Sequence, residues 1–221
     1  MDENLKGENS MNEIKEQEPR QTNVVVLIGA PASGKSTQFE HLRPRLEHRG
    51  FVSVPEVERD IIEEDRKNGI ERDSTPEGHL RLENRFLKAR AALEKSLNSS
   101  SNILMDRGLP DIAAYLRYYK ADESDALDAA KKVKYRQVFY LEPLLNYEKD
   151  TARIESPEFA KWMHENLPKV YEELGYEVVR VPVFPYEERE SYASEEEKAK
   201  DSINQRSKFI LEKMKEVGLP V

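Results

Sequence analysis

The chain has 221 residues, of which 38% are hydrophobic and 35% charged, a composition that suits one globular domain surrounded by charged helices. Acidic residues outnumber Lys and Arg by 43 to 35, and the net charge of −8 argues against broad electrostatic binding of nucleic acid or anionic membrane. The absence of cysteine excludes disulfides, thiolate zinc sites and cysteine nucleophiles, and it fits a reducing compartment.

The first 22 residues are polar and charged, and we expect them to form a disordered tail before a domain that spans residues 23–221. They lack the apolar stretch that a signal peptide or a membrane-spanning helix needs. The sequence therefore predicts a cytoplasmic protein that does not insert into a membrane.

Short apolar segments alternate with amphipathic ones along the rest of the chain, which indicates an α/β fold with a parallel sheet. The first apolar segment is an unbroken β-branched run, typical of a strand that is buried on both faces. We expect strands at 24–28, 51–54, 102–105, 137–141 and 177–181. We expect helices over 38–49, 57–67, 75–97, 124–132 and 157–174, and a further helix that starts at Pro110. Residues 186–202 are rich in Glu and Lys, and we interpret them as a mobile insertion before a closing C-terminal helix.

A phosphate-binding motif follows the first strand. Its residues match the pattern GxxxxGK[ST], with the required strand before it and helix after it: Gly29-Ala30-Pro31-Ala32-Ser33-Gly34-Lys35-Ser36. The glycines let backbone N–H groups approach phosphate oxygens, and the helix N-terminus adds partial positive charge. We expect Lys35 to reach the outer phosphates, Ser36 to ligate Mg²⁺ and Thr37 to contact the inner phosphate. This P-loop, Gly29–Thr37, predicts binding of ATP or GTP with Mg²⁺.

Charged residues follow two further strands, at the sheet edge where α/β proteins bind their ligands. Asp106 resembles a Walker B acid, but the next residue is Arg107 rather than a second carboxylate, which favours a small-molecule kinase over a motor ATPase. Asp106 is the candidate Mg²⁺ ligand and Arg107 the candidate substrate or phosphate clamp; an exposed ion pair is the alternative. Glu56 is a candidate for the residue that orients or deprotonates the acceptor, or it stabilises the N-terminus of its own helix.

Other residues carry weaker predictions. Arg153 is either a closing arginine that neutralises transition-state charge or a surface arginine, and Arg59 is either catalytic or solvated. The four histidines show no metal-ligand spacing, so we predict no zinc site. The aromatic residues fit helix faces that pack on the sheet rather than a base-stacking platform.

Four motifs together resemble the AAA-type single-domain ATPases related to the nicotinamide-ribonucleoside kinase domain of NadR and to a GTP-binding trafficking protein of photoreceptor channels. The resemblance covers most of residues 23–185, and its motifs are Gly29–Thr37, Val54–Ile62, Asp106–Asp111 with Ala114-Tyr115, and Tyr171–Tyr176 before Val181-Pro182. It implies a P-loop kinase-like three-layer fold with a mostly parallel five-stranded sheet flanked by helices. It also implies functional roles for Glu56, Arg59, Asp106, Arg107 and Arg153, and contacts of Val181 and Pro182 with the nucleotide base.

The chain departs from that family at Ala30 and Ala32, where relatives often have glycine, and near the C-terminus, where Arg189 and Arg206 are alternatives for one motif arginine. The favoured function is a Mg-dependent phosphotransferase that uses ATP or GTP, a small-molecule or nucleoside-type kinase with an unidentified acceptor. The alternative is a nucleotide-dependent regulatory NTPase or trafficking switch, with a protein partner and no small-molecule acceptor.

Overall fold

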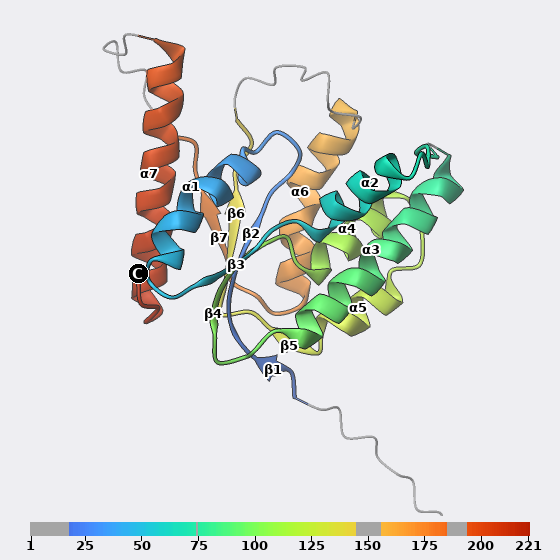
Figure 1. Cartoon of the computed structure of the whole chain (residues 1–221), viewed down its shortest axis with the longest axis horizontal. Helices are drawn as coiled ribbons and strands as arrows, with labels where there is room; N and C mark the ends of the chain where they lie inside the picture. Colours follow the sequence, from blue (N-terminus) through green and yellow to red (C-terminus); the bar gives the residue numbers. More distant parts are fainter. Residues whose placement is uncertain (1–17, 74, 145–155, 185–193) are drawn as a thin grey trace, which may run out of the picture.

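A parallel sheet forms the centre of the molecule (Figure 1), whose computed structural model describes residues 18–73, 75–144, 156–184 and 194–221. The five strands lie in the order β3-β4-β2-β6-β7, and all four neighbouring pairs are parallel. Their bounds are Asn23–Ile28 for β2, Val52–Val54 for β3, Asn102–Asp106 for β4, Gln137–Leu141 for β6 and Val178–Val181 for β7. Each strand expected from the sequence is present, with its ends shifted by at most one residue.

Helices cover both faces of this sheet, so the fold has three layers. In Figure 1, α1 and α7 lie on one side of the sheet and α3, α4 and α6 on the other, while α2 packs on α3. The helix bounds are Lys35–Glu47 for α1, Val57–Lys67 for α2, Pro76–Ser96 for α3, Leu109–Tyr118 for α4, Ser124–Ala130 for α5, Pro157–Glu173 for α6 and Glu195–Glu216 for α7. The expected α/β architecture is confirmed.

Alternate residues of β2 enter two separate apolar clusters. Val25 and Leu27 pack with Phe39 of α1 and Ile210 of α7 in one cluster. The intervening residues, Val24, Val26 and Ile28, pack on the other face with residues of α3, α4 and α6. Because both faces of the strand are buried, its sequence is continuously apolar instead of alternating.

Part of the segment that the sequence assigned to the tail belongs to the fold. Arg20–Gln21 form the short strand β1, which pairs in parallel with β5, Val133–Lys134. The Arg20 guanidinium donates hydrogen bonds to the carbonyls of Leu97, at 2.7 Å, and Glu94, at 2.5 Å. These two residues therefore do not belong to the tail expected over residues 1–22. Such long-range polar contacts leave no hydrophobic period in the sequence.

The last helix also begins earlier than expected. The Ser194 side chain caps α7 by accepting a hydrogen bond from the backbone N–H of Glu197, at 3.2 Å. Residues 195–202 are thus helical, and interpreting them as part of a mobile insertion was wrong, while residues 186–193 lie outside the described residues. The first turns of α7 are mostly exposed, so their Glu and Lys composition reflects a solvated helix face. Among the described helices, none is both long and apolar enough to cross a membrane.

Candidate functional site

The P-loop connects the carboxyl end of β2 to the N-terminus of α1 (Figure 1). Its backbone turns through two residues with positive φ, Ala32 at 67° and Gly34 at 75°. Gly29 is packed so tightly that an added Cβ would lie 2.4 Å from Ser33 Oγ. A left-handed conformation costs a non-glycine residue about 1–2 kcal/mol, so this backbone would favour glycine at the position of Ala32.

Lys35 and Asp106 form an ion pair where this loop meets the sheet. Lys35 is the first residue of α1 and is 6% exposed, and Asp106 is the last residue of β4 and is 3% exposed. Strand β4 pairs directly with β2, with Asp106 opposite Leu27, so the sheet register brings the two charges together. Ser36, the next residue of α1, is partly exposed, and Thr37 is exposed. The structure thus gathers the predicted phosphate and metal residues at one edge.

Glu56 and Arg107 form a second ion pair, with 2.8 Å between Glu56 Oε1 and Arg107 Nε. Glu56 occupies the N-cap position of α2, and its side chain makes no capping hydrogen bond. The alternative role, in which its charge stabilises the N-terminus of α2, stays a prediction. Arg107 has a φ of 62° and donates from Nη1 to the Tyr115 hydroxyl at 2.9 Å. Arg59 is exposed, and its Nη2 lies 3.7 Å from Glu56 Oε2.

The environment of Glu56 keeps this carboxylate ionised. Burial on its own would raise the pKa of Glu56. The charges of Arg107, Lys35, Arg59 and Arg90 outweigh that effect, so the pKa of Glu56 lies below its ordinary value. The effect of Lys35 also shows that the P-loop and the Glu56–Arg107 pair lie within electrostatic reach of each other.

Arg90 of α3 braces the turn that carries Asp106 and Arg107, a role that our sequence analysis missed. Its side chain is fully buried, and Nη1 donates to the carbonyl oxygens of Asp106 and Arg107, each at 3.2 Å. The same guanidinium binds both carboxylate oxygens of Glu58, and the Nε contact measures 3.2 Å. Arg90 follows Phe86 by one helical turn, so its place on the buried face of α3 was the available signal.

A buried network of hydroxyls and carboxylates holds the start of α4, directly after Arg107. Asp111 Oδ2 accepts hydrogen bonds from the Gly108 N–H at 3.1 Å and from the Tyr171 hydroxyl at 2.5 Å. Glu94 accepts from the Leu109 N–H at 3.0 Å and from the Tyr135 hydroxyl at 2.7 Å. Burial raises the pKa of Glu94 to about 7. The network links two of the sequence motifs, those at 106–111 and 171–176.

A cavity of about 70 Å³ lies beside the Glu56–Arg107 pair, among residues of α2, α3 and α4. We call it the acidic pocket because its charged lining has four carboxyl groups and two guanidinium groups: Glu56, Glu58, Glu83, Asp111, Arg72 and Arg107. The rest of its lining is apolar or aromatic, including Phe86 and Tyr115. Its place next to the predicted catalytic pair makes it the candidate acceptor site.

Arg206 of α7 joins three loops at the same edge of the sheet. Its guanidinium donates to the carbonyls of Ser33 at 2.7 Å, Glu142 at 2.7 Å and Pro182 at 2.9 Å. Of the two alternatives for the C-terminal motif arginine, Arg206 therefore contacts the P-loop, whereas Arg189 lies outside the described residues. Arg153 also lies outside them.

The two positions predicted to contact the base differ in how much side chain they expose. Val181 is the last residue of β7, and its side chain is fully buried in the cluster with Leu27 and Phe39. Pro182, the next residue, is partly exposed, and its carbonyl accepts the hydrogen bond from Arg206. The Val181 side chain therefore supports the loop from within the core, and the exposed surface at this point comes from Pro182.

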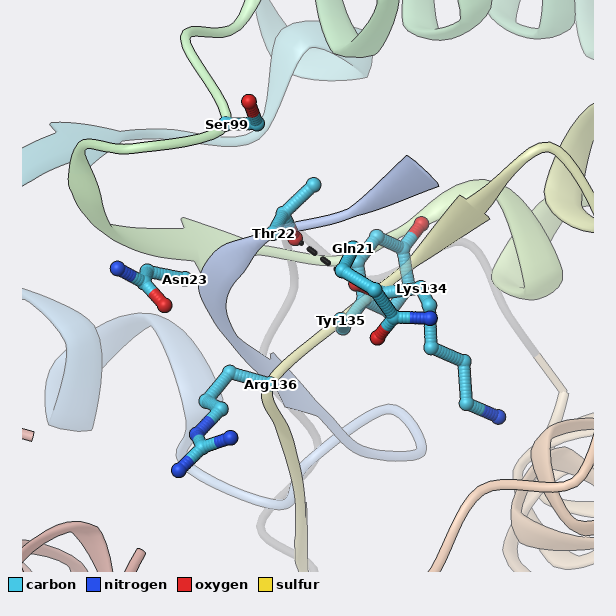
Figure 2. A pocket seen from close by; sticks show the side chains of 7 residues that line it. All are labelled: Gln21, Thr22, Asn23, Ser99, Lys134, Tyr135 and Arg136. Carbon is cyan, nitrogen blue, oxygen red and sulfur yellow. Dashed lines mark hydrogen bonds between the residues drawn. The ribbon is translucent and has the colours of Figure 1, made fainter. Parts of the chain in front are cut away.

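A second cavity, of about 260 Å³, lies at the opposite end of the strands. Its cations are already engaged, because Lys134 Nζ donates to the Gly175 carbonyl at 2.7 Å and Arg136 Nη2 bonds to the Val217 carbonyl. Figure 2 shows the Lys134 and Arg136 side chains extending in opposite directions, so their charges do not converge on one ligand. Ligands of parallel α/β sheets bind at the carboxyl ends of the strands, which favours the P-loop edge.

Comparisons with known proteins agree with this arrangement. Residues 24–189 match the family described as AAA domain. A search of curated proteins found no match. Among solved structures, NadR in complex with NR is 17% identical, with a TM-score of 0.53, over 85% of this chain and 51% of that chain. The present chain thus spans about half of that NadR structure.

Two further structures are matched over nearly their whole length. Thymidylate kinase from Ehrlichia chaffeensis is 13% identical, with a TM-score of 0.59, over 89% of this chain and 99% of that one. Deoxyadenosine kinase from M. mycoides is 15% identical, with a TM-score of 0.56, over 87% of this chain and 99% of that one. At these identities the similarity shows the fold, which is the P-loop kinase-like fold expected from the sequence.

Proposed function

This chain belongs to the AAA domain family, and from that premise we propose that it is a P-loop phosphotransferase that acts as a small-molecule, nucleoside-type kinase. The proposal rests on one observation. The Lys35–Asp106 pair and the Glu56–Arg107 pair lie together at the carboxyl ends of the strands, beside the acidic pocket. A motor or scaffold protein has no need of the second pair, whereas a kinase needs groups that hold an acceptor next to the nucleotide.

The nucleotide would bind along the P-loop, Gly29–Thr37. The left-handed turn at Ala32 and Gly34 and the N-terminus of α1 suit a cradle of backbone N–H groups for phosphate oxygens. Lys35 would exchange its contact with Asp106 for the outer phosphates, and Thr37 would contact the inner phosphate. The base would lie near Pro182, and both ATP and GTP are compatible with the proposal.

Mg²⁺ is implied by the P-loop pattern, and the donors present fit it. Protein sites for Mg²⁺ combine one or two oxygen ligands with phosphates of the nucleotide, which differs from a cage built wholly from side chains. The described residues contain no cluster of three or more His, Cys, Asp or Glu side chains able to hold a metal. Asp106 and Ser36 would hold the ion, which would neutralise charge on the phosphate oxygens.

In the proposed transfer, the acceptor hydroxyl oxygen forms a bond to the γ-phosphorus, while the bond from that phosphorus to the bridging oxygen breaks. The electron pair of the broken bond leaves with the nucleoside diphosphate. The hydroxyl proton passes to the carboxylate of Glu56 or, alternatively, of Asp106. The lowered pKa of Glu56 favours it in this role, because the group is ionised before the reaction. Arg107 would stabilise charge on the transferring group. The same role for Arg153 stays a prediction.

A regulatory NTPase is the second candidate, and Arg206 is the observation that favours it. Its three hydrogen bonds tie α7 to the P-loop carbonyl of Ser33 and to the loops after β6 and β7. A conformational change of the P-loop on nucleotide binding would therefore be transmitted to α7. A protein partner that binds α7 would then distinguish the two nucleotide states. A cytoplasmic location stays a prediction under both candidates.

The destination of the γ-phosphoryl group separates the two candidates. The protein is incubated with γ-labelled ATP or GTP, Mg²⁺ and a panel of nucleosides, nucleotides, sugars and other metabolites. Label on an organic acceptor supports the kinase. Label released only as free phosphate overturns it and supports the regulatory NTPase.

A Lys35→Ala variant tests whether the P-loop serves the reaction. We expect loss of nucleotide binding in calorimetry and of turnover, because the cation for the outer phosphates is removed. Lys88→Ala is the matched control, since Lys88 is an exposed lysine of α3 away from the P-loop. Unchanged binding and turnover in Lys35→Ala would contradict the proposed site.

A further inference from the structure

Arg206 of α7 is a buried cation directly beside the P-loop, and the proposed phosphoryl transfer gives it no role. The residue is only 3% exposed, and each of its three side-chain nitrogens donates to a different backbone carbonyl. Nη1 donates to Ser33 at 2.7 Å, Nη2 to Glu142 at 2.7 Å and Nε to Pro182 at 2.9 Å. A planar guanidinium has fixed donor directions, so it can hold several acceptors in one arrangement.

The bond to Ser33 fixes the orientation of one peptide group of the P-loop. The carbonyl and the N–H of a trans peptide point in opposite directions, so this contact turns the N–H of Gly34 away from Arg206. Gly34 has a φ of 75°, and an added Cβ there would lie 3.7 Å from Arg206 Nη1. Glycine restricts its own backbone little, so the contact with Arg206 has a large share in holding this peptide. The direction of each N–H in such a loop decides whether it meets a phosphate oxygen.

The other two carbonyls belong to the residues that follow β6 and β7. Strand β6 lies between β2 and β7, so both loops leave the sheet at the same edge as the P-loop. The two loops also contact each other, because the Glu142 N–H donates to the Val181 carbonyl at 3.0 Å. Arg206 therefore fixes the separation between Ser33, in the loop where phosphates would bind, and Pro182, where the base would lie.

Helix α1 holds α7 on both sides of Arg206. Gln38, directly after the P-loop, donates from Nε2 to the Ser207 hydroxyl at 2.5 Å and to the Ile203 carbonyl at 3.3 Å. The two helices lie side by side (Figure 1). The residues that α7 contributes to the apolar cluster of the sheet begin at Phe209. The turn of α7 that carries Arg206 is thus fixed by polar contacts with α1 and with the three loops.

We infer that Arg206 is a positioning residue for the nucleotide: it holds the Ser33–Gly34 peptide and the Pro182 carbonyl on one side chain, so that the phosphate loop and the base position form a single site. This inference rests on the proposed nucleotide site, which the kinase and the regulatory NTPase share. Arg206 acts through the backbone of these loops. The affinity for a nucleoside triphosphate should therefore depend on Arg206 more than the affinity for the phosphates alone.

Calorimetry with two ligands tests this dependence. The first is MgATP or MgGTP, whichever the wild type binds more tightly, and the second is inorganic tripolyphosphate with Mg²⁺, which offers phosphates without a base. In Arg206→Met three carbonyls lose their donor, and we expect the Kd for the nucleotide to rise by about tenfold or more. The Kd for tripolyphosphate, measured by competition with the nucleotide, should rise less, because only the Ser33–Gly34 peptide affects it.

Two further variants separate positioning from charge. Arg206→Lys keeps the positive charge but has one nitrogen in place of three, so we expect its nucleotide Kd to rise as well. Lys208→Met is the matched control, since it removes one positive charge from an exposed position of the same helix, and it should keep the wild-type Kd. Circular dichroism and urea unfolding show which variants are folded at the assay temperature, and Arg206→Lys carries the comparison where Arg206→Met is unfolded.

The outcomes distinguish this inference from the proposed function. A wild-type nucleotide Kd in folded Arg206→Met or Arg206→Lys would overturn the positioning role. An equal rise of Kd for the nucleotide and for tripolyphosphate would also overturn it, because the base position would then be independent of Arg206. A wild-type protein that binds neither ATP nor GTP would overturn the proposed nucleotide site, and the inference with it.

Discussion

Replacing Arg90 by methionine removes the brace behind Asp106 and Arg107. The substitution keeps an unbranched side chain of similar length but leaves the buried Glu58 carboxylate without its cation. It also removes the donor that serves the carbonyls of Asp106 and Arg107. Breaking a buried ion pair at one partner costs about 3–5 kcal/mol, which is a large share of the stability of an ordinary domain. We expect the free energy of unfolding to fall by that amount.

A second substitution separates the cost of the unpaired charge from the role of the brace. Glu58→Leu added to Arg90→Met removes the stranded carboxylate, and we expect it to restore about 2 kcal/mol or more. Phosphoryl transfer should not recover, because the two carbonyls still lack the donor that positions the turn. Arg85→Met is the matched control on α3, since Arg85 forms an exposed pair with Asp65 at 2.6 Å whose attraction is screened by water and salt.

Urea unfolding followed by far-UV circular dichroism measures these free energies, and labelled transfer measures the activity. An Arg90→Met protein as stable as the Arg85→Met control would refute the argument that Arg90 carries a buried pair. Recovery of transfer in the double variant would refute the positioning role.

Three further expectations concern stability and use the same unfolding assay. Ala32→Gly should raise the free energy of unfolding by up to about 1 kcal/mol, because glycine tolerates the φ of 67°; a decrease would contradict the strain. Gly108→Ala should lower it by about 1–3 kcal/mol, because the added Cβ would lie 2.7 Å from the Tyr135 hydroxyl; an unchanged value would contradict that contact. Burial raises the pKa of Glu83 to about 8 and of Glu94 to about 7, so the folded state holds these protons more tightly than the unfolded chain. The contribution of these two groups to stability should therefore be fully present below the ordinary pKa of 4.5 and be lost as the pH rises from there through about 7 and 8, and Glu83→Gln should flatten the upper part of that curve.

The elements that could be predicted are those whose residues carry a local pattern. The run Val24–Ile28 predicts a strand buried on both faces because no polar residue interrupts it. The P-loop is recognisable from a single short segment, because phosphate binding requires glycines and a lysine at fixed spacing within it. Asp106, Arg107 and Glu56 were expected at the sheet edge because the carboxyl ends of parallel strands share that edge.

Contacts between distant segments could not be predicted in this way. The position of Arg90 one turn after Phe86 places it on the buried face of α3, but its partners, the carbonyls of Asp106 and Arg107, follow only from the tertiary packing of that helix. The pairing of Arg20–Gln21 with β5 and the contacts of Arg206 with three loops are of the same kind. Such contacts depend on which segments of the chain lie side by side in the fold. No periodic pattern in the sequence indicates them.

The sequence by itself determined that this chain has a P-loop at the end of a central buried strand, because glycine conformations and apolar runs are local properties. Tertiary structure alone decided that Glu56 pairs with Arg107 instead of capping its helix. It also decided that Glu83 is buried without a partner at the acidic pocket. Burial and the positions of neighbouring charges set the protonation and availability of such groups, and both arise only when α2, α3 and α4 pack together.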